Sequence, residues 1–435
     1  MKFKKKIIFL ILIFFMINIG FSTFTFASTP TVGSGSAILI ETTTGRVLYE
    51  KNAYQRMYPA STTKVMTAIL TLENCKLSDM ATVSPNALES IPNGYVTVNL
   101  QIGEELTIKD LLYALMVKSA NDAAVVLAEH VSGSVENFSL LMNEKAKELG
   151  CKDTNFVNPN GIHNENHYST AYDLSIIAKY CMKNEIFRKI VSTTSYTLPA
   201  TNKYEAADRI FSNTNLLIMK NNNNRADNYY YKNATGIKTG YTSQAKNCLI
   251  AGSLRDNLEF ISVVLDAGFT DTGLSIRYLD TISLLDYGYD NFTLTKVKEA
   301  NNVAQTIEIP KATKETKNLD LLIENDITVV NNKTTDINSI SPKIELNENF
   351  IALISKGDII GTIKYTVDNI EYSSNLLAAN DVEKSDISTI LVVLGLILII
   401  IALIIYPGIK RKKNTKRKKT CRKRINDDIY SVFKT

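Results

Sequence analysis

From about Pro30 to Phe292 the chain mixes strand-like and helix-like hydrophobic patterns. Two strands joined by a turn at Thr44-Gly45-Arg46 are predicted between Ser36 and Leu48. Apolar residues at helical spacing predict later helices at 106–117, 122–131, 136–149 and 171–182. Strand character returns at 247–254 and 259–267, after an asparagine-rich segment at 221–228 that we expect to be a mobile loop. A helical insertion between strands predicts an α/β (α+β) domain at 30–293, with a mostly antiparallel sheet flanked by helices and a helical subdomain.

Beyond about Leu294 the pattern changes to short strand-like runs separated by Asn, Asp, Gly and Pro. The runs lie at 306–310, 326–332, 343–347, 350–367 and 371–379. Along one of them Ile363, Tyr365 and Val367 would face one side, and the polar residues between them the other. We therefore predict a small all-β domain at 297–380, which serves as a spacer or interaction module.

The two ends of the chain have the patterns of targeting and membrane segments. Lysines precede an apolar run from Ile7 to Ile19, and Thr25-Phe26-Ala27 is a small-x-small cleavage site, so we predict a signal peptide at 1–27. The alternative is that this segment is not cleaved and anchors the chain in the membrane. The segment Ile387 to Tyr406 contains no charged residue and is about 20 residues long, as a transmembrane helix requires. The basic tail at 407–435 is expected to stay in the cytoplasm, which leaves a single-pass protein of the cell membrane with its domains on the extracytoplasmic side.

Removing these ends changes the meaning of the net charge. Of 49 basic and 44 acidic residues, four basic ones lie in the signal peptide, and 12 basic with two acidic ones follow Asp386. The exported part is therefore acidic by nine charges, which argues against nucleic-acid binding. The five cysteines show no paired spacing, so we predict neither a disulfide framework nor a metal site built on sulfur.

The stretch YPASTTKVMTA places Ser61 and Lys64 three residues apart, directly after Pro59. Proline suits the start of a helix, and Ser61 or Thr62 could cap it. Residues at i and i+3 share a helix face, so the hydroxyl and the ammonium would lie side by side. Taken alone, however, the quartet favours a capped surface helix with an exposed lysine.

Two further clusters change that interpretation. Ser119-Ala120-Asn121 falls at a break between predicted helices, and Lys238-Thr239-Gly240-Tyr241-Thr242 falls just ahead of a predicted strand. Each alone could be a cap or a turn. Together, in this order and on an exported protein, they resemble the S-x-x-K, S-x-N and K-T-G set of the active-site serine penicillin-recognising enzymes.

Four more segments narrow the resemblance to the low-molecular-mass penicillin-binding proteins that are D-alanyl-D-alanine carboxypeptidases. They are 156–162, 167–174, 236–242 and 284–289, and the similarity extends from about residue 30 to 380. The resemblance implies a serine β-lactamase/penicillin-binding-protein-like transpeptidase fold. It also implies a hydrolase without a cofactor that removes the terminal D-alanine of peptidoglycan stem pentapeptides, limits cross-linking and is inhibited by β-lactam antibiotics.

The chemistry of the nucleophile can be argued from its residues. A serine hydroxyl attacks poorly until a base takes its proton, and Lys64 can do so only as a neutral amine. Burial and the second cation Lys238 would both lower the pKa of Lys64. We therefore expect Ser61 to form the acyl-enzyme with Lys64 as its general base. Ser119 would relay the proton that the departing amine needs.

The remaining residues are expected to bind the substrate. Asn121 would bond the penultimate amide and hold Ser119, while Lys238 and Thr239 would receive the terminal carboxylate. Gly240 leaves room for the substrate to lie along the following strand. The resemblance implies an oxyanion hole from the backbone N–H groups of Ser61 and Tyr241, and a carboxylate contact from Arg277.

Three alternatives remain open. His163 and His167 suggest zinc, although their spacing is not H-E-x-x-H and only His130 is left as a third histidine. A β-lactamase would need a carboxylate for its deacylating water, and Glu165 lies between the second and third motifs. A catalytically silent scaffold that binds the cell wall is the third alternative.

Membrane attachment departs from the family pattern, since many members dock by an amphipathic helix and Ile387 to Tyr406 is apolar all round.

Overall fold

The computed structural model describes residues 29–220, 229–347, 352–385, 390–405, 416–420 and 422. The predicted signal peptide and the asparagine-rich loop at 221–228 lie outside the described residues, as does most of the basic tail. The chain divides into two compact units. One comprises Met1–Thr295 with Val329–Asp336, and the other Lys296–Thr328 with Ile337–Thr435.

The first unit is built on a five-stranded antiparallel sheet, which confirms the predicted sheet type. Its strands follow the order β2 (Val47–Lys51), β1 (Ser36–Glu41), β9 (Leu258–Ala267), β8 (Lys246–Arg255) and β7 (Ala234–Thr242). β1 and β2 form the predicted hairpin. β7 carries the K-T-G motif and, among the described strands, pairs with β8 alone, so its other edge lies at the border of the sheet.

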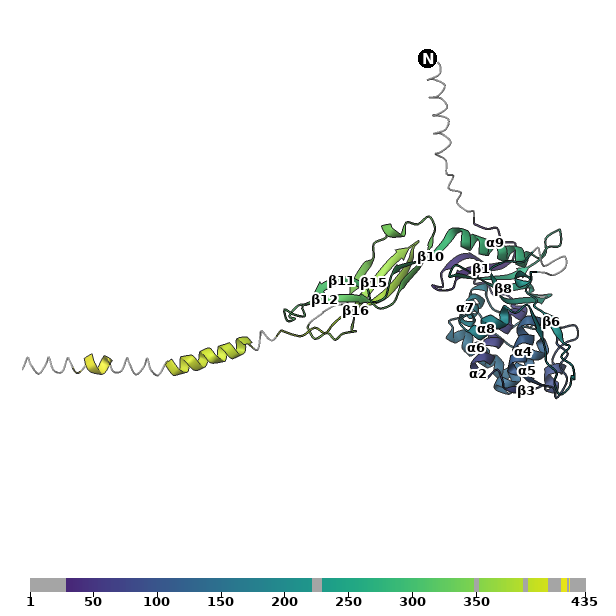
Figure 1. The fold of residues 1–435 in the computed structure, drawn as a ribbon, viewed down its shortest axis with the longest axis horizontal. Coiled ribbons are helices and arrows are strands. Elements are labelled where there is room, and N and C mark those ends of the chain that lie inside the picture. Colours follow the sequence, from purple (N-terminus) through teal and green to yellow (C-terminus); the bar gives the residue numbers. More distant parts are fainter. Residues whose placement is uncertain are drawn as a thin grey trace, which may run out of the picture. The chain divides into compact units, whose positions relative to one another are not determined.

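Helices cover both faces of this sheet (Figure 1). Side chains alternate across a strand, so Ala37 and Leu39 of β1 point to one face and Ile38 and Ile40 to the other. The first pair packs in a cluster with residues of α9 (Ile276–Asn291), and the second in the large core beneath α7 (Ala171–Cys181). Burial on both faces explains why these strands are continuously apolar.

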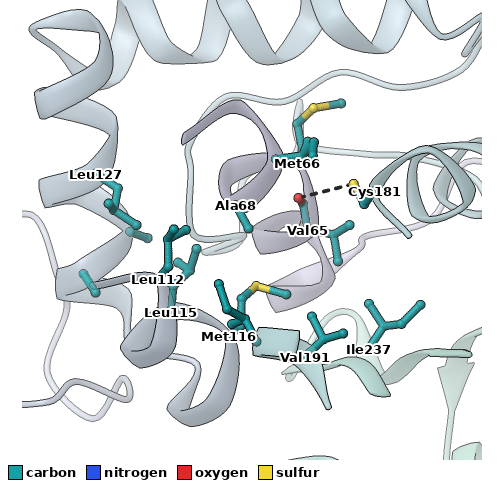
Figure 2. Packing of buried hydrophobic residues seen from close by; sticks show 14 of the residues in the cluster. Val65, Met66, Ala68, Leu112, Leu115, Met116, Leu127, Cys181, Val191 and Ile237 are labelled. Atoms are coloured by element: carbon teal, nitrogen blue, oxygen red, sulfur yellow. Dashed lines mark hydrogen bonds between the residues drawn. The ribbon is translucent and has the colours of Figure 1, made fainter. Parts of the chain in front are cut away.

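The helical part of the unit surrounds α2 (Lys64–Asn74), whose first residue is the lysine of S-x-x-K. Val65, Met66 and Ala68 of α2 are buried among neighbouring helices, and the Cys181 thiol contacts the Val65 carbonyl at 3.8 Å (Figure 2). This packing fixes the start of α2 against the sheet. The other elements here are the helices α3 (Pro85–Glu89), α5 (Asn121–Ser132), α6 (Val135–Glu148), α8 (Glu185–Val191) and η3 (Leu216–Ile218). Two small two-stranded sheets pair β3 (Met80–Thr82) with β4 (Glu105–Thr107) and β5 (Ser195–Thr197) with β6 (Ile210–Ser212).

The predicted helix at 106–117 has an unexpected end. It begins as predicted, because the Thr107 hydroxyl accepts the Asp110 N–H at 3.1 Å. α4 (Ile108–Tyr113) then passes into a π-helical turn, η2 (Ala114–Lys118), which ends at Ser119 in the left-handed region with φ of 70°. π-Helical turns are uncommon and often adjoin functional sites.

The second unit holds a five-stranded sheet in the order β11 (Val303–Glu308), β12 (Asn318–Ile323), β16 (Ile370–Ala378), β15 (Ile359–Val367) and β14 (Lys343–Leu346). Ile363, Tyr365 and Val367 are all buried, as predicted. β12 was not predicted, although Leu319, Leu321 and Ile323 show the same alternation. β13 (Ile327–Asn332) pairs instead with β10 (Phe292–Lys298) in a separate two-stranded sheet, and η5 (Ile337–Ser339) is a short turn.

The predicted transmembrane helix at Ile387 to Tyr406 is not confirmed. Its described portion, 390–405, is helical and its ends lie outside the described residues. Within the part of the chain that the structure describes, no helix has both the length and the apolar character for a membrane crossing.

Candidate active site

The S-x-x-K motif forms a tight turn rather than the first turn of an α-helix. Ser61 lies in the 3₁₀ turn η1 (Ala60–Thr63), and α2 begins only at Lys64. The predicted caps are wrong, because the Thr62 hydroxyl donates to the Pro59 carbonyl at 2.6 Å and no side chain that the structure describes caps α2. The spacing still brings the chemistry together, with Lys64 Nζ lying 2.9 Å from Ser61 Oγ.

Lys64 is fully buried, so the surface-lysine interpretation is wrong. Its amine lies 2.9 Å from Asn121 Oδ1 and 2.6 Å from the Asn160 carbonyl oxygen, in addition to Ser61. Burial first, and then the charge of Lys238, hold the pKa of Lys64 well below its usual value, against an opposing effect of Asp122. A neutral amine has two N–H donors for the two carbonyl-type acceptors, which leaves its lone pair for the Ser61 hydroxyl.

The S-x-N motif occupies the break after the π-helical turn. Ser119 is 8% exposed and its hydroxyl makes no hydrogen bond with any described residue, while Asn121 begins α5. The Asn121 amide is shared between Lys64, from which it accepts, and the Val96 carbonyl, to which it donates at 2.9 Å. The expectation that Asn121 holds Ser119 is therefore wrong, since its amide orients Lys64 instead.

The K-T-G motif lies on β7, against the turn that carries Ser61. A Cβ on Gly240 would lie only 3.0 Å from the Pro59 carbonyl oxygen and 3.1 Å from the Ser61 nitrogen, so any other residue would press on the backbone of the turn. The Thr239 hydroxyl lies 2.6 Å from that of Thr214. Tyr241 is 62% exposed and lines the same cleft.

Two cations lie behind this strand. Lys238 is buried and donates to the Thr239 carbonyl at 2.9 Å. Arg277 of α9 donates from Nη1 to the Gly240 carbonyl at 3.1 Å. Burial and then the charge of Arg277 lower the pKa of Lys238 to about 7. Two basic side chains beside hydroxyl groups are a suitable environment for a carboxylate.

A cavity of about 470 Å³ unites the three motifs. Seven of the nine predicted site residues line it, and the other two, Lys64 and Lys238, are buried behind its wall. The seven are Ser61, Ser119, Asn121, Thr239, Gly240, Tyr241 and Arg277. Sequence reasoning missed Thr214, for which it held no signal, and the Asn160 carbonyl, although Asn160 lies in one of the segments that carried the resemblance.

The residues that suggested a zinc site or a β-lactamase do not line the cleft that unites the three motifs. Both ring nitrogens of His167 are engaged, one with the Thr63 hydroxyl at 2.8 Å and the other with the Val157 N–H at 3.1 Å. Burial lowers the pKa of His167 to about 3, so the ring is neutral. Glu165 is exposed and lines a different cavity. Over the described ranges we find no group of three His, Cys, Asp or Glu side chains placed to hold a metal, and Cys75, Cys151, Cys181 and Cys248 are free thiols.

Comparison with known proteins agrees with this geometry. Residues 23–268 match the family described as D-alanyl-D-alanine carboxypeptidase, and residues 292–384 match the penicillin-binding protein 5 C-terminal domain. The D-alanyl-D-alanine carboxypeptidase DacF of Bacillus subtilis is 35% identical over 82% of this chain and 87% of its own length. DacA of Haemophilus influenzae is 32% identical over 82% of this chain and 87% of its own.

Solved structures give the same result. The crystal structure of penicillin binding protein 5 from Haemophilus influenzae matches with a TM-score of 0.69 at 29% identity, covering 82% of this chain and all of that one. It shares the α/β catalytic part and the all-β part that follows. The chain belongs to the D-alanyl-D-alanine carboxypeptidase family.

Proposed function

We propose that this protein is a serine-type D-Ala-D-Ala carboxypeptidase, which removes the terminal D-alanine from peptidoglycan stem pentapeptides and so limits their cross-linking. The observation that carries the proposal is the 2.9 Å contact of a buried lysine amine with the Ser61 hydroxyl, in a cleft backed by cations. The membership of the family supports the same reaction.

In the first step the neutral Lys64 amine takes the Ser61 proton as Ser61 Oγ attacks the carbonyl carbon of the penultimate D-alanine. The carbonyl oxygen becomes an oxyanion, for which the backbone N–H groups of Ser61 and Tyr241 would be the donors. The amide hydrogen bonds of Lys64 to Asn121 and Asn160 keep its lone pair directed at Ser61.

Collapse of the tetrahedral intermediate breaks the bond to the terminal D-alanine. Its nitrogen needs a proton, and the Ser119 hydroxyl can donate one while it takes another from the Lys64 ammonium. The free hydroxyl of Ser119 on the cleft wall suits this relay. Thr239 and Arg277 would hold the terminal carboxylate until D-alanine leaves, because charge-assisted hydrogen bonds are strong, and Lys238 behind the wall would add its positive charge.

Lys64 is neutral again after the amine has left, and it can take a proton from the water that attacks the acyl-enzyme. The tetrapeptide is released and Ser61 regains its proton. A penicillin offers an amide and a carboxylate at similar positions, but its leaving nitrogen stays tethered after ring opening. Its acyl-enzyme therefore persists, and the drug inhibits.

We also propose that the domains are exported and held at the outer face of the cell membrane by Ile387 to Tyr406, with the basic tail in the cytoplasm. The apolar composition of that segment and the basic flank support this. Fractionation of the full chain, compared with a chain that ends at Asp386, tests it. Release of the shorter chain from the membrane fraction is expected, and equal retention of both would contradict the anchor.

The proposed activity is tested with the full chain and a peptide that ends in D-Ala-D-Ala. The parent should release D-alanine in the presence of EDTA, and Ser61→Ala should not. Labelled penicillin should remain attached to the parent; rapid hydrolysis of the drug would indicate a β-lactamase instead. Absence of D-alanine release and of labelling would favour the silent scaffold, and loss of activity in EDTA would favour zinc.

A further inference from the structure

The catalytic unit holds a second cavity of about 470 Å³. Its wall includes Arg56, Tyr58, Glu165, Tyr168, Gln244 and Asp266. Two chain segments pass from the cleft into this cavity. Gly161 and Ile162 line the cleft and Glu165 follows in the cavity, while Thr242 and Ser243 line the cleft and Gln244 follows. These short connections, three residues in one segment and one in the other, indicate that the second cavity lies close to the first, beyond the end of β7.

The direction of the substrate along β7 decides which part of it reaches this cavity, and this step rests on the proposed function. The terminal carboxylate belongs at Thr239 and Arg277, and a peptide added to the open edge of β7 would run antiparallel to it. Its amino-terminal side then leads towards Thr242 and the turn to β8. At about 3.4 Å per residue, the third residue of the stem peptide, two positions before the terminal D-alanine, arrives at that turn.

The charges around the second cavity are paired, with one exception. Arg56 is held by Asp153 at 2.8 Å and stacks on Tyr168, with 4.5 Å from its guanidinium carbon to the ring centre. Asp266 is held by Lys246 at 2.7 Å. Glu165 makes neither a hydrogen bond nor an ion pair with any residue that the structure describes, and it is exposed. The cavity therefore offers aromatic walls and one uncommitted carboxylate, which suits an ammonium group on an aliphatic arm.

We propose that this cavity is the subsite for the third residue of the stem peptide, and that Glu165 selects a diamino acid whose side-chain amine is free. The residue that a β-lactamase would need as a base thus acts here in substrate selection. Glu165 contacts no reacting atom in this proposal.

The test compares two tripeptides, Nα-acetyl-L-Lys-D-Ala-D-Ala with its side-chain amine free or acetylated, and measures kcat/KM for D-alanine release by the full chain. The parent should prefer the free amine by about two- to five-fold, the range for an exposed ion pair, and high salt should reduce the preference. Glu165→Gln should bring the ratio to about one, and Glu165→Lys should reverse it. Each ratio compares kcat/KM for the two peptides with the same variant, so differences in the amount of folded enzyme cancel.

Glu144→Gln is the matched control, because Glu144 is an exposed carboxylate on α6, which lines neither cavity. It should keep the parent's ratio. A parent that does not distinguish the peptides, or a preference that survives in Glu165→Gln, would overturn the subsite. Absence of D-alanine release from both peptides would instead reject the proposed function, so the two failures are distinguishable.

Discussion

Gly161→Ala tests whether the packing behind the turn sets the reactivity of Ser61. Gly161 has φ of 80°, and a Cβ there would lie 1.9 Å from the Ala60 carbonyl oxygen and 2.4 Å from its carbon. Both atoms belong to the backbone, so they cannot rotate away. Either the turn with Ser61 or the peptide before Gly161 must move, and that peptide's carbonyl, from Asn160, accepts from Lys64 at 2.6 Å.

The magnitude follows from three separate effects. A left-handed conformation costs a non-glycine residue about 1–2 kcal/mol, and overpacking against rigid backbone adds about 1–3 kcal/mol. A displacement of about 1 Å between the reacting groups costs about 100-fold in rate. Gly133→Ala is the matched control, because Gly133 has φ of 81° and no atom of the described residues lies within 4 Å of its Cβ position.

Stopped-flow acylation by a fluorescent penicillin, with urea unfolding of the same samples, separates these effects. Gly161→Ala should acylate about 100-fold more slowly than the parent. Gly133→Ala should acylate at the parent rate, and its free energy of unfolding should fall only by the roughly 1–2 kcal/mol that the left-handed conformation costs. Acylation of Gly161→Ala at the parent rate would refute the link between this packing and Ser61, and an equal loss in Gly133→Ala would assign the effect to backbone strain in general.

Three further predictions concern charge. Lys238→Met removes a cation that lowers the pKa of Lys64. The fall in the rate of penicillin acylation at low pH, where Lys64 is protonated, should therefore begin at a higher pH. An unchanged pH dependence would contradict the effect of Lys238 on Lys64. Arg277→Gln should raise KM for D-alanine release about 10- to 150-fold, since a charge-assisted hydrogen bond contributes about 1.5–3 kcal/mol, and an unchanged KM would remove Arg277 from the carboxylate site. His167 binds a proton near pH 6.5 when unfolded but only at about 3 when folded, so its contribution makes the unfolding free energy fall as pH drops between these values. The unfolding free energy of His167→Gln, measured by urea titration at several pH values, should lack this part of the dependence on pH, which is at most about 1.4 kcal/mol per pH unit. A dependence equal to the parent's would show that the ring does not stay neutral.

The sequence predicted most of the first unit because its signals were local and strong. Apolar periodicity placed α5, α6 and α7 within about two residues of their observed ends, and the Thr107 cap was visible as a motif. The continuous apolar runs of β8 and β9 reflect burial on both faces. The three catalytic motifs were recognisable because each is short and contiguous.

The parts that were missed depend on long-range contacts. A π-helical turn shares the apolar pattern of an α-helix, so nothing in the residues of η2 separates the two, and the left-handed conformation of Ser119 is imposed by what surrounds it. The Asn160 acceptor is a backbone carbonyl, which any residue could supply. Thr214 reaches Thr239 from a distant segment. The caps predicted for α2 failed because the preceding turn is 3₁₀ and its hydroxyl bonds back to Pro59.

The account depends most on Lys64 acting as a neutral base on the hydroxyl 2.9 Å away. Rapid-quench mass spectrometry of the full chain with benzylpenicillin measures this directly, in the parent and in Lys64→Arg, which keeps a positive charge but cannot lose its proton. The parent should gain the mass of one penicillin on the peptide that contains Ser61, and Lys64→Arg should do so at least about 100-fold more slowly. Acylation of both at the same rate, or an adduct on another residue, would contradict the central claim.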